Sequence, residues 1–280
     1  MAPRLRVLET NLLHADGALV WLDATTGDPD DTETMSSIRD PLAVTLTSHP
    51  RDLRWLAKPG RLVLWRRPSG PMIRGEADHA ELARPTLTPY RIAGTAADPT
   101  GRFNPLRFDL TVTGSAGQPL LLYRSPFGAH TASGPDTGAG GVLEGTLRYE
   151  ATGDPALDGQ PARWALLRLD VTLVPADADN PAQVRSFVAQ ADANGDFRLL
   201  LRRLPPLSDG VDHYGASLSI QAPVGAAADA PPVAGLDAMH IGAVAAPFGF
   251  APALALDISP GGVKRIDSTG RDHLAVTPAA

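Results

Sequence analysis

The sequence contains no cysteine, and this absence removes several kinds of chemistry at once. Disulfide bonds, thiolate nucleophiles and cysteine-type zinc sites all require the missing sulfur, so stability must come from packing. The motifs of common enzymes are missing as well: there is no His-Glu-x-x-His, no Gly-x-Ser-x-Gly, no P-loop and no dinucleotide fingerprint. We therefore expect no enzymatic activity, no catalytic residue, no cofactor and no metal ion.

Clustered positive charge is also scarce in this chain. The formal net charge is -6 and the isoelectric point is near 5.6, whereas a phosphate-binding surface needs clustered Lys and Arg. Nucleic acid is therefore not an expected partner. The amino terminus is basic, but His14 and Asp16 interrupt its apolar run, so it lacks the hydrophobic region of a signal peptide. We expect a cytoplasmic protein, or part of a particle assembled in the cytoplasm.

One segment, residues 238–256, carries no formal charge and is nearly long enough to span a bilayer. Gly242, Pro247, Gly249 and Pro252 interrupt it, and it has neither a basic flank nor an aromatic belt. We therefore expect a buried or interface-forming irregular segment and no membrane insertion.

Short β-strands are the expected secondary structure. The 27 glycines and 27 prolines punctuate short strands well and long helices badly. Apolar and polar residues alternate with period two over residues 41–47, 106–113 and 165–173, and residues 61–65 form a more buried apolar run. Residues 48–58 are the best helix candidate, with Ser48 as the cap. The pattern predicts an all-β fold with little helix.

Two stretches rich in Gly, Ala and Pro, residues 127–141 and 222–235, have the composition of linkers or long surface loops. With the strand patterns they divide the chain into four expected parts. These are an amino-terminal β-rich domain (1–90), a middle β region (91–138), a central module (139–207) and a carboxyl-terminal β or irregular region that forms an interface arm (208–280).

The stretch from residue 189 to 207 contains an acidic cluster that resembles the start of a calcium-binding EF-hand loop. Asp192, Asn194 and Asp196 occupy the first, third and fifth loop positions. Phe197 then stands where the loop needs glycine, and Arg203 stands where it needs glutamate. The cluster therefore does not fit a calcium loop.

A tight turn between two strands explains the same residues. Asn194-Gly195 suits a hairpin turn with positive φ, and the side chain of Asp192 is suited to closing it. Apolar residues alternate into and out of the turn: Phe187, Ala189, Ala191, then Phe197, Leu199, Leu201. We therefore expect a hairpin that bends the chain and binds nothing.

The pattern of this turn occurs twice. Both copies have the form Asp-x-x-Gly-x-Phe, and an alternating strand follows each: Asp98, Gly101, Phe103 and Asp192, Gly195, Phe197. A Gly-Thr pair opens each module, at Gly94-Thr95 and at Gly145-Thr146. These matches indicate an internal repeat.

The expected hairpin and the two strands before it, residues 145–153 and 163–173, resemble the carboxypeptidase-regulatory-like or transthyretin-like β-sandwich family. The matching residues are Gly145, Asp192, Gly195, Phe197, Leu204 and Pro205. The resemblance implies an immunoglobulin-like sandwich that is not itself catalytic, and hence serial β-sandwich modules along the chain. The connection Pro175–Gln183 is longer than the family pattern.

The histidines and tryptophans give no strong site. Asp-His pairs occur at 78–79, 212–213 and 272–273, but neighbours on a strand point to opposite faces. A metal trio of His79, His213 and His273 would need distant segments to converge, so we expect solvated loop histidines. The tryptophans, whose neighbours are typical of strands, are expected in the core: Trp21, Trp55, Trp65 and Trp164.

Three functions are compatible with these features. The first is a structural or adaptor protein that acts through protein–protein interfaces, as part of a larger assembly and as a homo-oligomer. By analogy, such chains resemble accessory components of phage tail-like contractile injection particles, such as baseplate, cap or fibre-attachment parts. The alternative is a glycan- or cell-surface-binding protein, favoured if Trp21 or Tyr214 is exposed in a groove. The third, an enzyme built from scattered Asp and His, has the least support.

Overall fold

The computed structural model describes residues 17–66, 88–114, 117–128, 140–174, 181–202, 204–207 and 211–279. Over these ranges the expected all-β class is confirmed, since they contain strands and no α-helix. Their helical structure is of the 3-10 type and includes η1 (Thr32–Thr34), where the Asp31 side chain accepts a hydrogen bond from the Glu33 amide at 3.0 Å. No helix of the described residues is long and apolar enough to cross a membrane.

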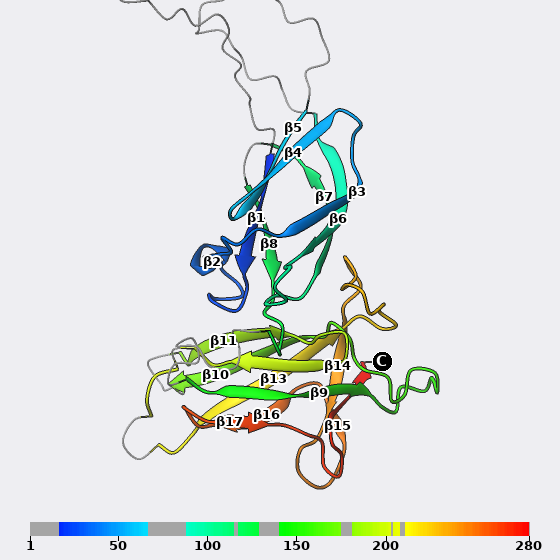
Figure 1. The fold of residues 1–280 in the computed structure, drawn as a ribbon. Coiled ribbons are helices and arrows are strands. Elements are labelled where there is room, and N and C mark those ends of the chain that lie inside the picture. The colour runs from blue at the N-terminus through cyan, green and yellow to red at the C-terminus, as the bar shows by residue number, and fades with distance from the viewer. Residues whose placement is uncertain are drawn as a thin grey trace, which may run out of the picture.

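The amino-terminal unit, residues 17–128, forms two sheets. Its strands in the described ranges are β1 (Gly17–Asp23), β2 (Ser36–Ser37), β3 (Ala43–Ser48), β4 (Leu53–Lys58), β5 (Arg61–Arg66), β6 (Tyr90–Ala97), β7 (Leu106–Val112) and β8 (Gly117–Leu122). One sheet has the order β2-β1-β5-β4, with β8 parallel to β1, and the other has the order β3-β6-β7. Strands from both sides of the expected boundary at residue 90 therefore share these sheets (Figure 1).

One apolar core lies between the two sheets of this unit. Leu19 and Leu64 enter it from the first sheet and Ile92 and Phe108 from the second, and all four are buried. The alternation in residues 106–113 gives β7 its buried Phe108, as the pattern predicts for a strand with one face in a core.

The expected helix over residues 48–58 is wrong. Leu53–Lys58 is β4, an antiparallel partner of β5, and Gly60 makes the turn between them with φ +79°. In β4 Leu53 is buried and the rest of the strand is exposed. The residues before β4 imitate a helix start, but no face of the segment is apolar enough to hold a helix against a core.

The carboxyl-terminal unit, residues 140–279, forms one large curled sheet (Figure 1). Its strands in the described ranges are β9 (Val142–Tyr149), β10 (Leu166–Val174), β11 (Gln183–Gln190), β12 (Asp196–Leu200), β13 (Tyr214–Ala222), β14 (Asp237–Gly242), β15 (Phe250–Ala251), β16 (Leu254–Ile258), β17 (Val263–Arg265) and β18 (Leu274–Pro278). The order is β11-β10-β13-β14-β18-β9-β12, with β15 on β14, β16 on β13 and β17 on β9. Strands from both sides of residue 207 therefore share the sheet.

The concave face of this sheet encloses the larger core, which includes Leu167, Leu169, Phe197 and Leu218. The apolar segment 238–256 contributes to it through β14 and β16, with Met239, Ile241, Leu254 and Leu256. Because β14 and β16 pair with β13, and β14 also with β18, both ends of the segment belong to the sheet. Residues 244–249 between them are exposed, so only the strand residues of the segment are used for burial.

The turn expected at Asp192 is present, but the hairpin around it is not. Gly195 has φ +80°, its amide donates to the carbonyl of Asp192 at 3.1 Å, and the Asp192 side chain accepts from the amides of Asn194 at 2.7 Å and Asp196 at 3.1 Å. The strands on either side do not pair with each other: β11 pairs with β10, and β12 pairs with β9. The turn therefore connects the two edges of the curled sheet.

The repeated pattern produces the same local turn at Asp98. The Asp98 side chain accepts from the amides of Thr100 at 2.9 Å and Arg102 at 3.1 Å, and the Gly101 amide donates to the Asp98 carbonyl at 3.0 Å. Gly101 also has positive φ, +68°. The strands around this turn, β6 and β7, do pair with each other, so the two copies share the turn and not the strand arrangement.

Candidate functional site

The two units contact each other through polar and apolar groups. Arg168 on β10 donates two hydrogen bonds to the carboxylate of Asp30, at 2.9 and 2.8 Å. The Asn104 side chain donates to the carbonyls of Gln190 and Ala191, each at 3.3 Å. A small apolar cluster joins the units as well, made of Leu22, Ala24, Met35 and Val188.

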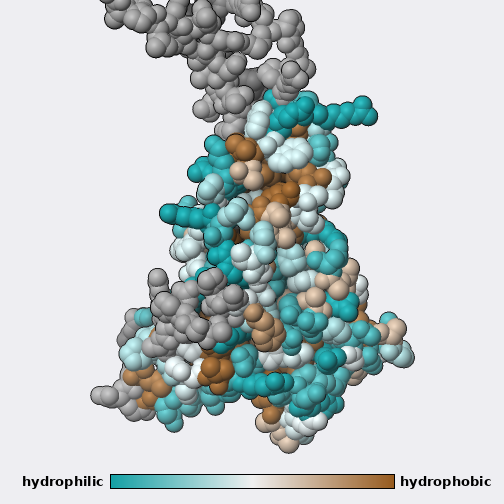
Figure 2. Space-filling model, viewed as in Figure 1, coloured by the Kyte–Doolittle hydropathy of each residue, from teal (hydrophilic) through white to brown (hydrophobic). Residues whose placement is uncertain are grey.

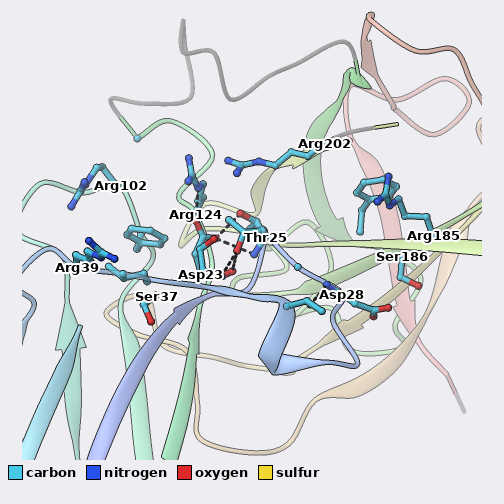
Figure 3. A pocket seen from close by; sticks show the side chains of 18 of the residues that line it. Asp23, Thr25, Asp28, Ser37, Arg39, Arg102, Arg124, Arg185, Ser186 and Arg202 are labelled. Carbon is cyan, nitrogen blue, oxygen red and sulfur yellow. Dashed lines mark hydrogen bonds and ion pairs between the residues drawn. The ribbon is translucent and has the colours of Figure 1, made fainter. Parts of the chain in front are cut away.

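Beside these contacts lies a cleft of about 1060 Å³ that residues of both units line (Figure 3). We call it the junction cleft. Its amino-terminal wall includes the end of β1, the segment around β2 and the Asp98 turn, and its carboxyl-terminal wall includes β11. Among the described residues that line it, five are arginines and three are acidic: Arg39, Arg102, Arg124, Arg185, Arg202, and Asp23, Asp28, Asp40.

The Asp98 turn holds Arg102 at the cleft. Arg102 Nε lies 3.2 Å from a carboxylate oxygen of Asp98, and its Nη1 lies 2.7 Å from Asp40. Burial raises the pKa of Asp98, but the hydrogen bonds from Thr100 and the charge of Arg102 outweigh burial and lower that pKa below its ordinary value. The carboxylate therefore stays ionised and fixes the guanidinium.

A second buried aspartate fixes Arg124. The Asp23 carboxylate accepts from Arg124 Nε at 2.8 Å and from the amide and hydroxyl of Thr25 at 3.0 and 2.6 Å. Asp23 is only 3% exposed, so this pair lies at the floor of the cleft. Figure 3 shows Asp23, Thr25 and Arg124 close together, with Arg202 beside them.

Arg39 differs from these two arginines. It is exposed, and the described part of the chain gives it no hydrogen bond or ion pair. Arg185 is also exposed and stands on β11, in the opposite wall of the cleft. Among the described residues that line the junction cleft, basic side chains thus outnumber acidic ones, in a chain whose net charge is -6. Such a concave basic surface attracts anionic groups.

Two sheet edges also line the junction cleft. β2 ends the order of the first sheet and β11 ends the order of the curled sheet, so each pairs on one side among the described strands. An edge strand keeps main-chain N–H and C=O groups that another strand can pair with. The cleft therefore offers main-chain groups and guanidinium groups together.

Comparison with family models, curated proteins and solved structures finds no match. The five arginines come from widely separated positions, which is why no cluster is visible in the sequence. The one signal that points to part of this site is the Asp-x-x-Gly turn at Asp98, whose Arg102 lies in the cleft.

The expectation for the Asp-His pairs is partly wrong. His213 Nδ1 lies 2.9 Å from Asp212, and His273 Nδ1 lies 2.8 Å from Asp272, although neighbours on a strand would point apart. Both pairs stand just outside strands, where the backbone does not alternate. His273 also contacts Glu150 at 2.8 Å. His79 lies outside the described residues, and among those described no group of three or more His, Asp or Glu side chains is arranged so that it could hold a metal ion.

The aromatic residues are distributed differently from the expectation. Trp21 and Trp164 are buried, as expected, whereas Trp55 is 39% exposed on β4 and Trp65 is only partly buried. Tyr214 is buried, and its hydroxyl donates to the carbonyls of Pro205 and Pro206. Neither Trp21 nor Tyr214 is therefore the exposed groove residue that would favour glycan binding.

We predict that calcium does not stabilise the protein and that Asp192→Asn is tolerated. Both carboxylates of the turn are engaged, since Asp196 accepts from the Thr146 hydroxyl at 2.6 Å. Burial raises the pKa of Asp192, so a charged Asp192 weakens the fold above that pKa and the penalty falls as the pH falls. Asn keeps the acceptor oxygen without the charge. The melting temperature of the Asp192→Asn variant at pH 7 should equal or exceed that of the wild type.

Thermal unfolding with 10 mM calcium and with EDTA tests this prediction. A site with a dissociation constant of about 0.1 mM would add about 2.7 kcal/mol at that concentration. A calcium-dependent rise in melting temperature that Asp192→Asn abolishes would contradict the structural role of the turn.

Proposed function

We propose that this chain is a non-catalytic structural or adaptor protein that acts through protein–protein interfaces. The observation that carries the proposal is the set of open sheet edges with exposed apolar side chains. β4 is the clearest case: it pairs only with β5 among the described strands, and Trp55 and Leu56 on it are 39% and 49% exposed. Because neighbours on a strand face opposite sides, both faces of β4 extend beyond the core.

Other edges support the same function. Val184 on β11 is 53% exposed, and Val263 on β17 is 63% exposed. In the space-filling view, hydrophobic side chains gather on the amino-terminal unit between β4 and β3, while much of the surface is hydrophilic (Figure 2). Exposed edges of this kind are pairing sites for strands of other chains.

The finer parts of the proposal follow from the sequence. Serial β-sandwich modules, with the central one similar to the carboxypeptidase-regulatory-like or transthyretin-like family, would supply rigid spacers between interfaces. The partners would be proteins of a larger assembly made in the cytoplasm, with the chain itself as a homo-oligomer. A phage tail-like contractile injection particle is the assembly that we propose, with the chain at its baseplate, cap or fibre attachment.

Two experiments separate this function from the glycan-binding alternative. Size fractionation of an extract from cells that produce the full chain should place it in a complex larger than one chain. The purified protein should show no retention on a glycan array. A single chain that the array retains would favour glycan binding and contradict the proposal.

A further inference from the structure

We infer that the junction cleft binds an extended acidic segment of a protein partner, which pairs with the edge of β11 and places carboxylates against Arg39 and Arg185. The inference rests on the proposed function, because it names the partner chemistry at one interface. Three observations carry it: the direction of the main-chain groups of β11, the charge of the cleft and its size.

The main-chain groups of alternate residues of β11 point into the cleft. The Ala191 amide donates to the Ala165 carbonyl at 2.8 Å, in the direction of β10, whereas the Gln190 carbonyl accepts from Asn104 on the other side. In an antiparallel pair this alternation continues along the strand, so Ser186 and Val184 direct their N–H and C=O groups away from β10. Both residues line the junction cleft.

The opposite wall also presents an outward main-chain position. The Ile38 amide donates to the Trp21 carbonyl at 2.9 Å, so Ile38 faces β1 and its neighbour Ser37 on β2 faces away from β1. Ser37 and Ile38 line the cleft with Arg39. An extended chain along β11 would therefore meet polar groups on both sides.

The charge selects the side chains of the ligand. Arg39 and Arg185 are exposed, one in each wall, and guanidinium groups bind carboxylates through paired hydrogen bonds. Arg102 and Arg124 lie deeper in the cleft, and each is paired with aspartate there. Their charge is neutralised by these partners, so the exposed arginines select the ligand.

The size of the cleft favours a peptide segment over a single ion. Sites for drug-sized ligands have volumes of about 300–1,000 Å³, and the junction cleft has about 1060 Å³. A nucleic acid is a poorer fit, because the whole chain carries a net charge of -6 and would repel a long polyanion. A short acidic strand places its charge only at the arginines.

Fluorescence anisotropy on the full chain tests the inference. The probe is a labelled peptide of about eight residues in which Asp alternates with Thr and Val, and the control peptide has Asn in place of Asp. We expect the acidic peptide to bind, and we expect its affinity to fall as the salt concentration rises, because salt screens exposed charge pairs. The double variant Arg39→Gln with Arg185→Gln should weaken binding about tenfold.

Matched variants separate charge from strand pairing. Arg61→Gln removes one charge from an exposed arginine on β5 outside the cleft and should leave binding unchanged. Val184→Pro removes an outward amide that β10 does not need, so the fold should persist while binding weakens about fivefold. Val184→Ala keeps the amide and should bind within about twofold of the wild type.

Several results would overturn the inference. These are equal binding of the acidic and Asn peptides, binding that the arginine variants do not change, no binding at about 1 mM peptide, or tighter binding of a single-stranded oligonucleotide. If the acidic peptide does not bind but the chain is still recovered in a larger complex, this inference alone would be contradicted. Recovery as a single chain would remove the proposed function itself.

Discussion

Replacing Gly195 with alanine should lower the free energy of unfolding of the carboxyl-terminal unit by about 3 kcal/mol. Two costs combine in this variant. Gly195 has φ +80°, which an alanine adopts only with strain, and a Cβ atom there would overlap the carbonyl oxygen of Leu147 on β9. Since the turn connects the two edges of the curled sheet, the neighbouring backbone has little room to move. Urea unfolding followed by tryptophan fluorescence measures the change.

Gly153→Ala is the matched control in the same unit. Gly153 has nearly the same φ, +78°, but nothing lies within 4 Å of a Cβ atom built there. The free energy of unfolding of this variant should fall by only about 1 kcal/mol, which is the cost of the backbone conformation alone. An equal fall in the free energy of unfolding of the two variants would show that the turn does not approach β9 as closely as the structure places it.

Replacing Asp98 with alanine should lower the free energy of unfolding of the amino-terminal unit by about 3 kcal/mol. The Asp98 side chain is 1% exposed and accepts hydrogen bonds from the amides of Thr100 and Arg102, from the Thr100 hydroxyl and from Arg102 Nε. Alanine leaves two turn amides without this acceptor and removes a buried counter-charge from Arg102. The junction cleft would lose the fixed position of that arginine.

The pH dependence of stability provides the control. Because the folded pKa of Asp98 lies below the ordinary value of 3.8, its contribution is fully present above that value and is lost as the pH falls through the folded pKa. The wild type should therefore lose part of its advantage over Asp98→Ala below about pH 4. Asp98→Asn, which keeps an acceptor oxygen, should lose less than Asp98→Ala at pH 7. A difference in free energy of unfolding between the wild type and Asp98→Ala that grows as the pH falls would contradict the ion pair.

The sequence predicts local structure well in this protein, because local geometry depends on neighbouring residues. The alternation in 106–113 and 165–173 identifies β7 and β10 and their buried faces. The repeated Asp-x-x-Gly pattern identifies both turns. The two turn aspartates nevertheless differ in the direction of their pKa shift. Burial raises the pKa of Asp192, whereas at Asp98 the hydrogen bonds from Thr100 and the charge of Arg102 outweigh burial and lower the pKa.

The arrangement of strands could not be predicted in the same way. Alternation shows which face of a strand is buried, but it does not identify the strand beside it. Phe187 and Phe197 therefore indicated a hairpin, although β11 and β12 stand at opposite ends of the sheet order. The junction cleft is harder still, since it needs arginines from both units and the position of one unit against the other.

The most direct test of the interface function is the size at which the full chain is recovered from cells that produce it, measured by gel filtration of a gently prepared extract. The structure, with its open edges at β4, β11 and β17, predicts recovery in a complex that contains other protein chains or several copies of this one. Recovery only as a single chain of 29.4 kDa would contradict it.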